Sequence, residues 1–352
     1  MKTKENSFPS DKRRLVFQGI LAMLVLAIVV GEPLLLVKPF KKLTGKGLNG
    51  RAWRASYLER HLTVPPGGQP REGFWGSKFS PQTKADSQLG DILYERHIPG
   101  LFDIDSAGMQ YAFSDAHPDI RILIIGGSVA AGAYASNEHR TYFNQLAKRL
   151  GRHGHHVAIT VQATGGWTSD QELNALRYRG LTMKPDCVLF LDGLNDVTLN
   201  RQIPEEERVR RYLAHMREAR DLALANGIKV VFSPQPFLPQ KREKTGLEML
   251  ILAESYRPLD ELVKGYTDLR HGLQTLCVPH SAYFMDCSGV FDRPRATVFA
   301  DIWHFSDFGH ARLAEYMAIK LDPIVRDIED QKGLLTQELA LRSPADSPYF
   351  HY

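Results

Sequence analysis

The sequence predicts a three-layer α/β protein, in which a parallel sheet of about five strands lies between two layers of helices, preceded by one N-terminal transmembrane helix. From residue 120 onward, short apolar runs alternate with helix-like stretches. Continuous apolar runs, rather than alternating ones, are typical of parallel strands buried on both faces. The alternation of strand and helix then places the helices on both sides of the sheet.

The predicted strands lie at residues 120–125, 157–161, 187–191, 228–232 and 281–285. The helix-like stretches between them lie at residues 140–152, 169–179, 205–226 and 256–276. Residues 233–255 form a connection that is longer than usual and contains Pro234, Pro236 and Pro239. We expect this connection to form a lip at the carboxyl ends of the strands.

An apolar segment at residues 15–37 predicts the membrane helix. It follows Lys12, Arg13 and Arg14, as in a signal peptide or a signal anchor. No small-x-small cleavage site follows it, so an uncleaved anchor is favoured. Lysines also follow the segment, so the distribution of positive charge does not decide the orientation of the helix. A short basic tail before a first apolar segment nevertheless favours an orientation with the tail inside. The domain is therefore expected on the periplasmic or extracellular side of the inner or plasma membrane.

These observations divide the chain into five regions. They are a cytoplasmic tail (1–14), a transmembrane anchor (15–37), a juxtamembrane stalk and lead-in (38–118), the α/β domain (119–325) and a C-terminal tail (326–352). The stalk and lead-in are predicted to be irregular, because they are rich in proline, glycine and basic residues.

Composition narrows the classes of function. With 43% hydrophobic and 24% charged residues, the chain is expected to fold. Its formal charge of +4 is small and gathers near the apolar segment, which favours a membrane surface over nucleic acid as a partner. Cys187 lies in an apolar run and is predicted to be a buried thiol, whereas Cys277 and Cys287 could pair in an oxidising compartment. No cysteine or histidine spacing suits zinc, and the sequence does not bear on the oligomeric state.

Residues able to carry chemistry follow the predicted strands. In parallel α/β sheets, active sites form outside the carboxyl ends of the strands. Ser128, Gly166 and Asn195 follow the first, second and third strands, and Asp301 and His304 precede the last helix. Taken alone, each of the first three residues also fits a structural role. Ser128 could cap a helix or belong to a phosphate-binding turn, Gly166 could be a turn glycine, and Asn195 could form an Asx turn. An Asp-x-x-His pair can orient an imidazole to accept a proton from a serine.

The spacing Asp-x-x-His occurs twice, at Asp301–His304 and at Asp307–His310. Ser306 is a good N-cap, which would place the second pair in the first turn of the last helix. There Asp307 would complement the helix dipole, and His310 would lie on the helix surface. The first pair, on a loop before the helix, is therefore the predicted catalytic pair.

Together, and in this order, the four segments resemble the SGNH (GDSL-type) hydrolase family, in which Ser, Gly, Asn and His come from separate blocks on a flavodoxin-like sheet. The resemblance covers about residues 119–320. The sequence departs from the family pattern at Gly127, where the family has Asp, and at Gly165, which adjoins the chosen Gly166. Gly166 is preferred because it lies two residues before Thr168, as the family's glycine does. The matching segments are Gly126–Val129, Gly166–Ser169, Gly193–Asp196 and Asp301–His304.

The resemblance implies a serine esterase without metal or organic cofactor. Ser128 would attack an acyl ester, His304 would act as the base and Asp301 would orient it. Backbone N–H groups of Ser128 and Gly166 and the Asn195 amide would form the oxyanion hole. The anchor suggests an envelope or extracellular glycan or a lipid as the carrier of the acyl group, acetyl included. The alternatives are an O-acyltransferase with the same triad and a non-catalytic binding or assembly protein.

Overall fold

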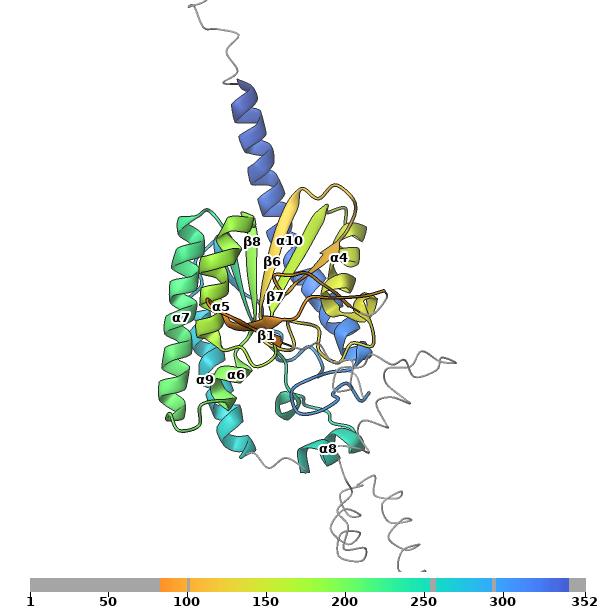
Figure 1. The fold of residues 1–352 in the computed structure, drawn as a ribbon, viewed down its shortest axis with the longest axis vertical. Coiled ribbons are helices and arrows are strands. Elements are labelled where there is room, and N and C mark those ends of the chain that lie inside the picture. The colour runs from red at the N-terminus through yellow and green to blue at the C-terminus, as the bar shows by residue number, and fades with distance from the viewer. Residues whose placement is uncertain (1–82, 100–101, 254–257, 293–295, 342–352) are drawn as a thin grey trace, which may run out of the picture.

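The computed structural model describes residues 83–99, 102–253, 258–292 and 296–341 (Figure 1). The predicted tail and anchor (1–37) lie outside these residues, as do the stalk up to residue 82 and the end of the chain from residue 342. Among the helices that are described, none is long and apolar enough to cross a membrane.

A six-stranded sheet forms the centre of the described part of the chain. Its strands in spatial order are β10 (Ala282–Phe284), β9 (Lys229–Pro234), β8 (Cys187–Asp192), β6 (Ile120–Gly126), β7 (Val157–Ala163) and β5 (Met109–Phe113). All pairings are parallel except that of β5 with β7. The parallel strands are those that the apolar runs predict, and their order, 2-1-3-4-5 along the chain, is the flavodoxin-like one.

Burial explains why these segments form central strands. Every residue of β8 and of β9 is buried. Strands covered on both faces have no solvent side, so both of their faces are lined mainly by aliphatic and aromatic side chains. This is the reason why the apolar runs are continuous.

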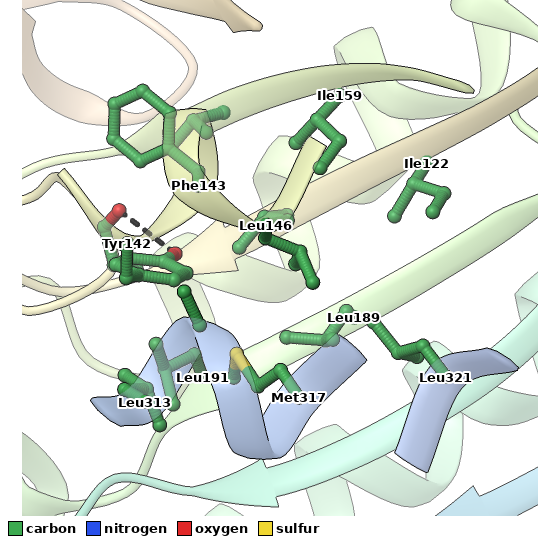
Figure 2. Close-up of a cluster of buried hydrophobic side chains, with 14 of the residues drawn as sticks. Ile122, Tyr142, Phe143, Leu146, Ile159, Leu189, Leu191, Leu313, Met317 and Leu321 are labelled. Carbon is green, nitrogen blue, oxygen red and sulfur yellow. Dashed lines mark hydrogen bonds between the residues drawn. The ribbon is translucent and has the colours of Figure 1, made fainter. Parts of the chain in front are cut away.

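Helices cover the sheet on both faces (Figure 1). On one face lie α4 (Tyr142–Arg152) and α10 (Asp307–Leu341), and on the other lie α5 (Ser169–Ala175), α7 (Glu205–Ala225) and α9 (Leu259–Gln274). Figure 2 shows how Leu146 of α4 and Met317 of α10 meet Ile122 and Leu189 of the sheet. Burying each such side chain stabilises the fold by about 1.5–3 kcal/mol.

The remaining short elements lie in the connections. They are η1 (Glu138–Arg140), η2 (Leu176–Gly180), η3 (Leu181–Met183), α6 (Leu194–Thr198), η4 (Leu238–Gln240) and α8 (Gly246–Ala253). The last helix, α10, starts directly after Ser306, as predicted, but it continues to Leu341. Its buried Val325 and Ile328 pack in the core on the α4 side. The predicted boundary between domain and tail at residue 325 therefore falls inside a helix.

The lead-in was predicted to be irregular, but part of it forms strands. Two small hairpins precede the main sheet, β1 (Thr83–Asp86) with β2 (Gly90–Leu93) and β3 (Arg96–Ile98) with β4 (Phe102–Ile104), and β5 then joins the sheet edge. Leu93 and Ile104 are buried in the core. These strands are short and owe their order to packing on the domain, a contribution that local composition does not reveal.

The long connection after β9 lies at the edge of the sheet where the parallel strands end (Figure 1). Its Leu238 N–H donates to the carbonyl of Ile302 at 3.0 Å. Within it, Lys241 and Glu248 form a fully buried ion pair at 2.6 Å. Glu248 also accepts the backbone N–H of Val298 at 2.9 Å. The connection therefore supports the chain that leads to Asp301 and His304.

The three cysteines are free thiols. Cys187 is buried as predicted, but Cys277 is exposed while Cys287 is buried, so the two do not pair. Burial raises the pKa of both Cys187 and Cys287 to about 12, so these two thiols stay protonated at neutral pH.

Candidate functional site

The structure brings Ser128, His304 and Asp301 into one hydrogen-bonded chain. The Oγ of Ser128 lies 2.8 Å from Nε2 of His304. The other ring nitrogen, Nδ1, lies 2.8 Å from Oδ2 of Asp301. The imidazole is thus held between a hydroxyl and a carboxylate, the arrangement in which it can accept the proton of the hydroxyl.

Asp301 is held as a carboxylate by its own loop. Its Oδ1 accepts the backbone N–H groups of Trp303 and His304, each at 2.7 Å. Burial by itself raises the pKa of Asp301, but the charge of His304 and the hydrogen bonds from these donors outweigh it and leave the pKa below its ordinary value. The Asp-x-x-His spacing lets the same carboxylate accept the backbone N–H of His304 and contact its imidazole.

Ser128 stands at the start of a series of tight turns that follows β6. The N–H of Ala131 donates to the carbonyl of Gly127, and that of Ala133 donates to the carbonyl of Ser128, both at 3.0 Å. The next α-helix, α4, begins at Tyr142, close to the predicted start at residue 140. The serine is partly exposed.

Asn195 reaches over from the end of β8. Its Nδ2 donates to the carbonyl of Trp167, in the loop after β7, at 2.7 Å. A Cβ built on Gly127 would lie 2.6 Å from the same Nδ2. The glycine that departs from the family pattern is therefore a spatial requirement here, because a side chain would displace the amide that lies beside Ser128.

The two glycines after β7 differ in conformation. A Cβ built on Gly165 would lie 3.8 Å from the Cβ of Ser128, so this residue adjoins the serine. Gly166 has φ +88°, a left-handed conformation in which glycine is favoured, and a Cβ there would meet no atom within 4 Å. The choice of the Gly166 N–H as an oxyanion donor stays a prediction.

The second Asp-x-x-His pair, Asp307 and His310, lies in the first turn of α10, as predicted. His310, however, does not lie on the helix surface. It is fully buried, with Nε2 at 2.9 Å from the carbonyl of Ala133 and Nδ1 at 3.3 Å from the N–H of Tyr142. Burial lowers its pKa to about 4, so the ring is neutral at pH 7. The surface prediction failed because helix periodicity does not reveal that residues 130–142 cover this face.

Asp307 lies in the first turn of α10, as predicted, and it makes contacts that the sequence did not indicate. Its carboxylate accepts the N–H of Ser136 at 2.8 Å and the hydroxyl of Ser136 at 2.5 Å. Burial raises its pKa, and the hydrogen bonds from Ser136 oppose this rise. Ser306 occupies the N-cap position, yet its buried Oγ has no hydrogen-bond partner. The start of α10 is thus fixed by contacts with residues near Ser128.

A group of carboxyl groups near the loops that carry Asn195 and Gly166 was not predicted from the sequence. Asp196 accepts the N–H and hydroxyl of Ser169, and burial raises its pKa to about 8. Next to it, Glu172 and Asp192 are both buried, and the hydroxyl of Tyr212 donates to Asp192 at 2.8 Å. Burial and the nearby charge of Asp192 raise the pKa of Glu172 well above its ordinary value, so Glu172 holds a proton at neutral pH.

The lead-in strands support the loop after β7, a contact that sequence reasoning also missed. The indole N–H of Trp167 donates to the carbonyl of Asp91 at 2.9 Å. The side-chain amide of Gln171 donates to the carbonyl of Leu89 at 2.9 Å. Both bonds go to backbone oxygens, so no side-chain pattern in residues 83–93 could have indicated them.

No group of three or more His, Cys, Asp or Glu residues within the described ranges is arranged to hold a metal ion.

A profile of the GDSL-like lipase/acylhydrolase family matches residues 124–312, more than half of the chain. The chain therefore belongs to this family and is an ester hydrolase. A comparison with curated proteins finds no match.

Similar solved structures include three hydrolases. A lipase/acylhydrolase from Enterococcus faecalis is 19% identical, with 58% of this chain and 96% of that chain covered and a TM-score of 0.44. An acetylxylan esterase from Geobacillus stearothermophilus is 16% identical, with 60% and 94% covered and a TM-score of 0.42. An alpha/beta hydrolase enzyme from the metagenome of Lake Arreo, Spain, is 17% identical, with 60% and 98% covered and a TM-score of 0.43. The family assignment rests on the profile match.

The proton on Glu172 predicts a pH dependence of folding. Because the folded state holds a proton that the unfolded chain releases above a pH of about 4.3, stability should fall as the pH rises through and above that value. Glu172→Gln carries a permanent donor and should reduce this fall. Asp196 contributes in the same sense, so part of the slope should remain. Urea denaturation at about pH 5, 7 and 9 measures it.

The matched control for this experiment is Glu206→Gln, at an exposed glutamate of α7. It should leave the pH dependence as it is in the unmodified protein. Equal slopes for Glu172→Gln and Glu206→Gln would mean that Glu172 is ionised in the folded state.

Proposed function

We propose that this enzyme is a serine esterase in which Ser128 is the nucleophile, His304 the general base and Asp301 the residue that orients His304. The observation that carries the proposal is the continuous hydrogen-bonded chain from Ser128 Oγ through the imidazole to Asp301. Ser128 Oγ attacks the ester carbonyl while Nε2 accepts its proton. The same proton then goes to the departing alcohol, and an acyl-enzyme remains on Ser128. Water, deprotonated by His304, releases the acid.

In this proposal the negative charge on the tetrahedral oxygen is stabilised by the N–H groups of Ser128 and Gly166 and by the amide of Asn195. An amide nitrogen carries two N–H groups. One of those on Asn195 donates to Trp167, which fixes the amide and leaves the second N–H for the substrate oxygen. A fixed donor needs no reorganisation during the reaction, which is the physical basis of its effect on rate.

For the substrate, we propose acyl esters, acetyl esters included, carried by an envelope or extracellular glycan or by a lipid. The support is the apolar segment at residues 15–37, preceded by basic residues, which would tether the enzyme to the inner or plasma membrane. The acetylxylan esterase from Geobacillus stearothermophilus shows by its name that deacetylation of a glycan occurs on a similar fold. Product analysis with a glycan acceptor present would detect acyl transfer in place of hydrolysis.

Labelling and hydrolysis test the nucleophile and the base together. We expect a fluorophosphonate to label Ser128, and Ser128→Ala to abolish both labelling and ester hydrolysis while the protein stays folded. His304→Ala should lose nearly all activity, and Asp301→Ala should show a smaller but large loss. Mass spectrometry of the labelled peptide and turnover of p-nitrophenyl acetate are the measurements.

His310→Ala is the matched control, because it removes a second histidine that does not contact Ser128. It should lower stability, since a buried ring and two hydrogen bonds are lost, and change activity by less than about tenfold. An inactive His310→Ala together with an active His304→Ala would move the base to His310. Labelling of another serine would end the mechanism.

Asn195→Ala tests the oxyanion hole. Loss of one donor typically lowers turnover by about a hundredfold or more, so kcat should fall to that extent while Ser128 is still labelled to completion. Asn195→Asp, which keeps the shape but carries no N–H, should also be slow. If both variants turn over at the rate of the unmodified enzyme, Asn195 serves only to hold the loop after β7.

The proposed topology places residues 1–14 inside the cell and the catalytic domain outside the membrane. A protease added to intact spheroplasts should then digest the domain, while a cytoplasmic marker protein in the same cells stays intact. Protection of the domain until the cells are lysed would reverse the orientation.

A further inference from the structure

Tyr134 stacks on the imidazole of His304. The two ring centroids are 4.9 Å apart, and the ring planes are inclined by only 17°. Tyr134 belongs to the turns that follow Ser128, so it approaches the imidazole from the nucleophile's own segment. The two edge nitrogens of this ring already face Ser128 and Asp301, and Tyr134 covers one of its faces.

The backbone of Tyr134 is strained. Its φ of +69° lies in the left-handed region, which a bulky side chain adopts at a cost of roughly 1–3 kcal/mol. Glycine would meet no such cost at this position. A tyrosine here is thus unfavourable for folding, unless contacts of its side chain compensate.

Two contacts fix the residues on either side of Tyr134. The carbonyl of Ala133 accepts a hydrogen bond from His310, and Ser136 donates two to Asp307. Both partners lie in the first turn of α10, directly after the loop that carries His304. The segment with Tyr134 and the loop with His304 are therefore anchored to the same helix end, which fixes one ring relative to the other.

From this geometry we infer that Tyr134 is a positioning residue for His304, an inference that rests on the proposed catalytic role of His304. The stack restricts rotation of the imidazole, so that Nε2 stays directed at Ser128 after the bond between them is broken during turnover. The face of the aromatic ring also interacts favourably with the imidazolium that forms when the proton is transferred. Both effects act on the chemical step, so they change kcat more than KM.

A purely structural role for Tyr134 makes the opposite prediction. If the ring only filled space, Tyr134→Gly would lose apolar contacts and stability, and the activity of the folded fraction would be preserved. If the ring positions His304, glycine relieves the backbone strain and the loss appears in kcat. Strain of this kind, retained in a folded protein, is found most often at functional sites.

The test uses the full-length protein and p-nitrophenyl acetate as the probe. We expect Tyr134→Gly to lower kcat by about tenfold to a hundredfold, as a misplaced catalytic group does, with KM changed by less than about threefold. Tyr134→Phe keeps the ring and should restore kcat to nearly the original value. Tyr134→Leu keeps apolar bulk without an aromatic face and should behave like Tyr134→Gly, so the test stands even if the glycine variant does not fold.

Lys184→Gly is the matched control. Lys184 also has a positive φ, +50°, but it is exposed. It lies just before the start of β8, whereas Ser128 follows the end of β6, so the two residues lie at opposite ends of the strands. Glycine there should relieve the same kind of strain and leave kcat unchanged.

The outcomes separate this inference from the proposed function. If Ser128 of the unmodified protein is labelled by a fluorophosphonate but Tyr134→Gly or Tyr134→Leu keeps full kcat, the positioning role is wrong and the triad stands. A loss of kcat in Tyr134→Phe as large as in Tyr134→Leu would also overturn it, because the hydroxyl would then be the active feature. If Ser128 of the unmodified protein is not labelled, both proposals fall.

Discussion

Parallel pairing of β6 with both of its neighbours brings Ser128, Gly166 and Asn195 to one end of the sheet. Gly126, the last residue of β6, pairs with Ala163 of β7 on one side and with Leu191 of β8 on the other. The three strands therefore end at the same level, and the next few residues of each chain meet there. A Cβ on Gly126 would lie 2.3 Å from the carbonyl oxygen of Leu191, so the approach of β6 and β8 at this point depends on glycine.

From this common edge the site is completed by chain segments that hold one another. Asn195 binds the loop after β7 through Trp167, and α10 binds the turns after Ser128 through Asp307 and His310. Each of these contacts joins residues far apart in the sequence. Because the contacts are hydrogen bonds between buried or partly buried groups, breaking one leaves an unsatisfied partner, and the arrangement is correspondingly rigid.

Burial gives chemically similar residues different charge states in this region. Asp301 keeps its charge, since several donors and His304 surround it, whereas Glu172 retains a proton because its burial is not compensated by a cation. His310 is neutral in the core, while His304 faces a carboxylate. The environment, and not the residue type, thus separates a group suited to proton transfer from groups that hold the fold together.

The sequence alone determined the parallel strands and the main helices, because continuous apolar runs are properties of neighbouring residues. The prediction of Ser128, His304 and Asp301 came from the resemblance of four segments, in their order, to a known family. The sequence did not indicate β1 to β5, whose order comes from packing on the domain. Nor did it reveal the burial of His310, the carboxyl pair of Glu172 and Asp192, or the stack of Tyr134 on His304. These contacts depend on which distant segments of the chain pack together. Only the tertiary structure decides this packing, because the residue pattern of one segment does not show which of its faces another segment covers.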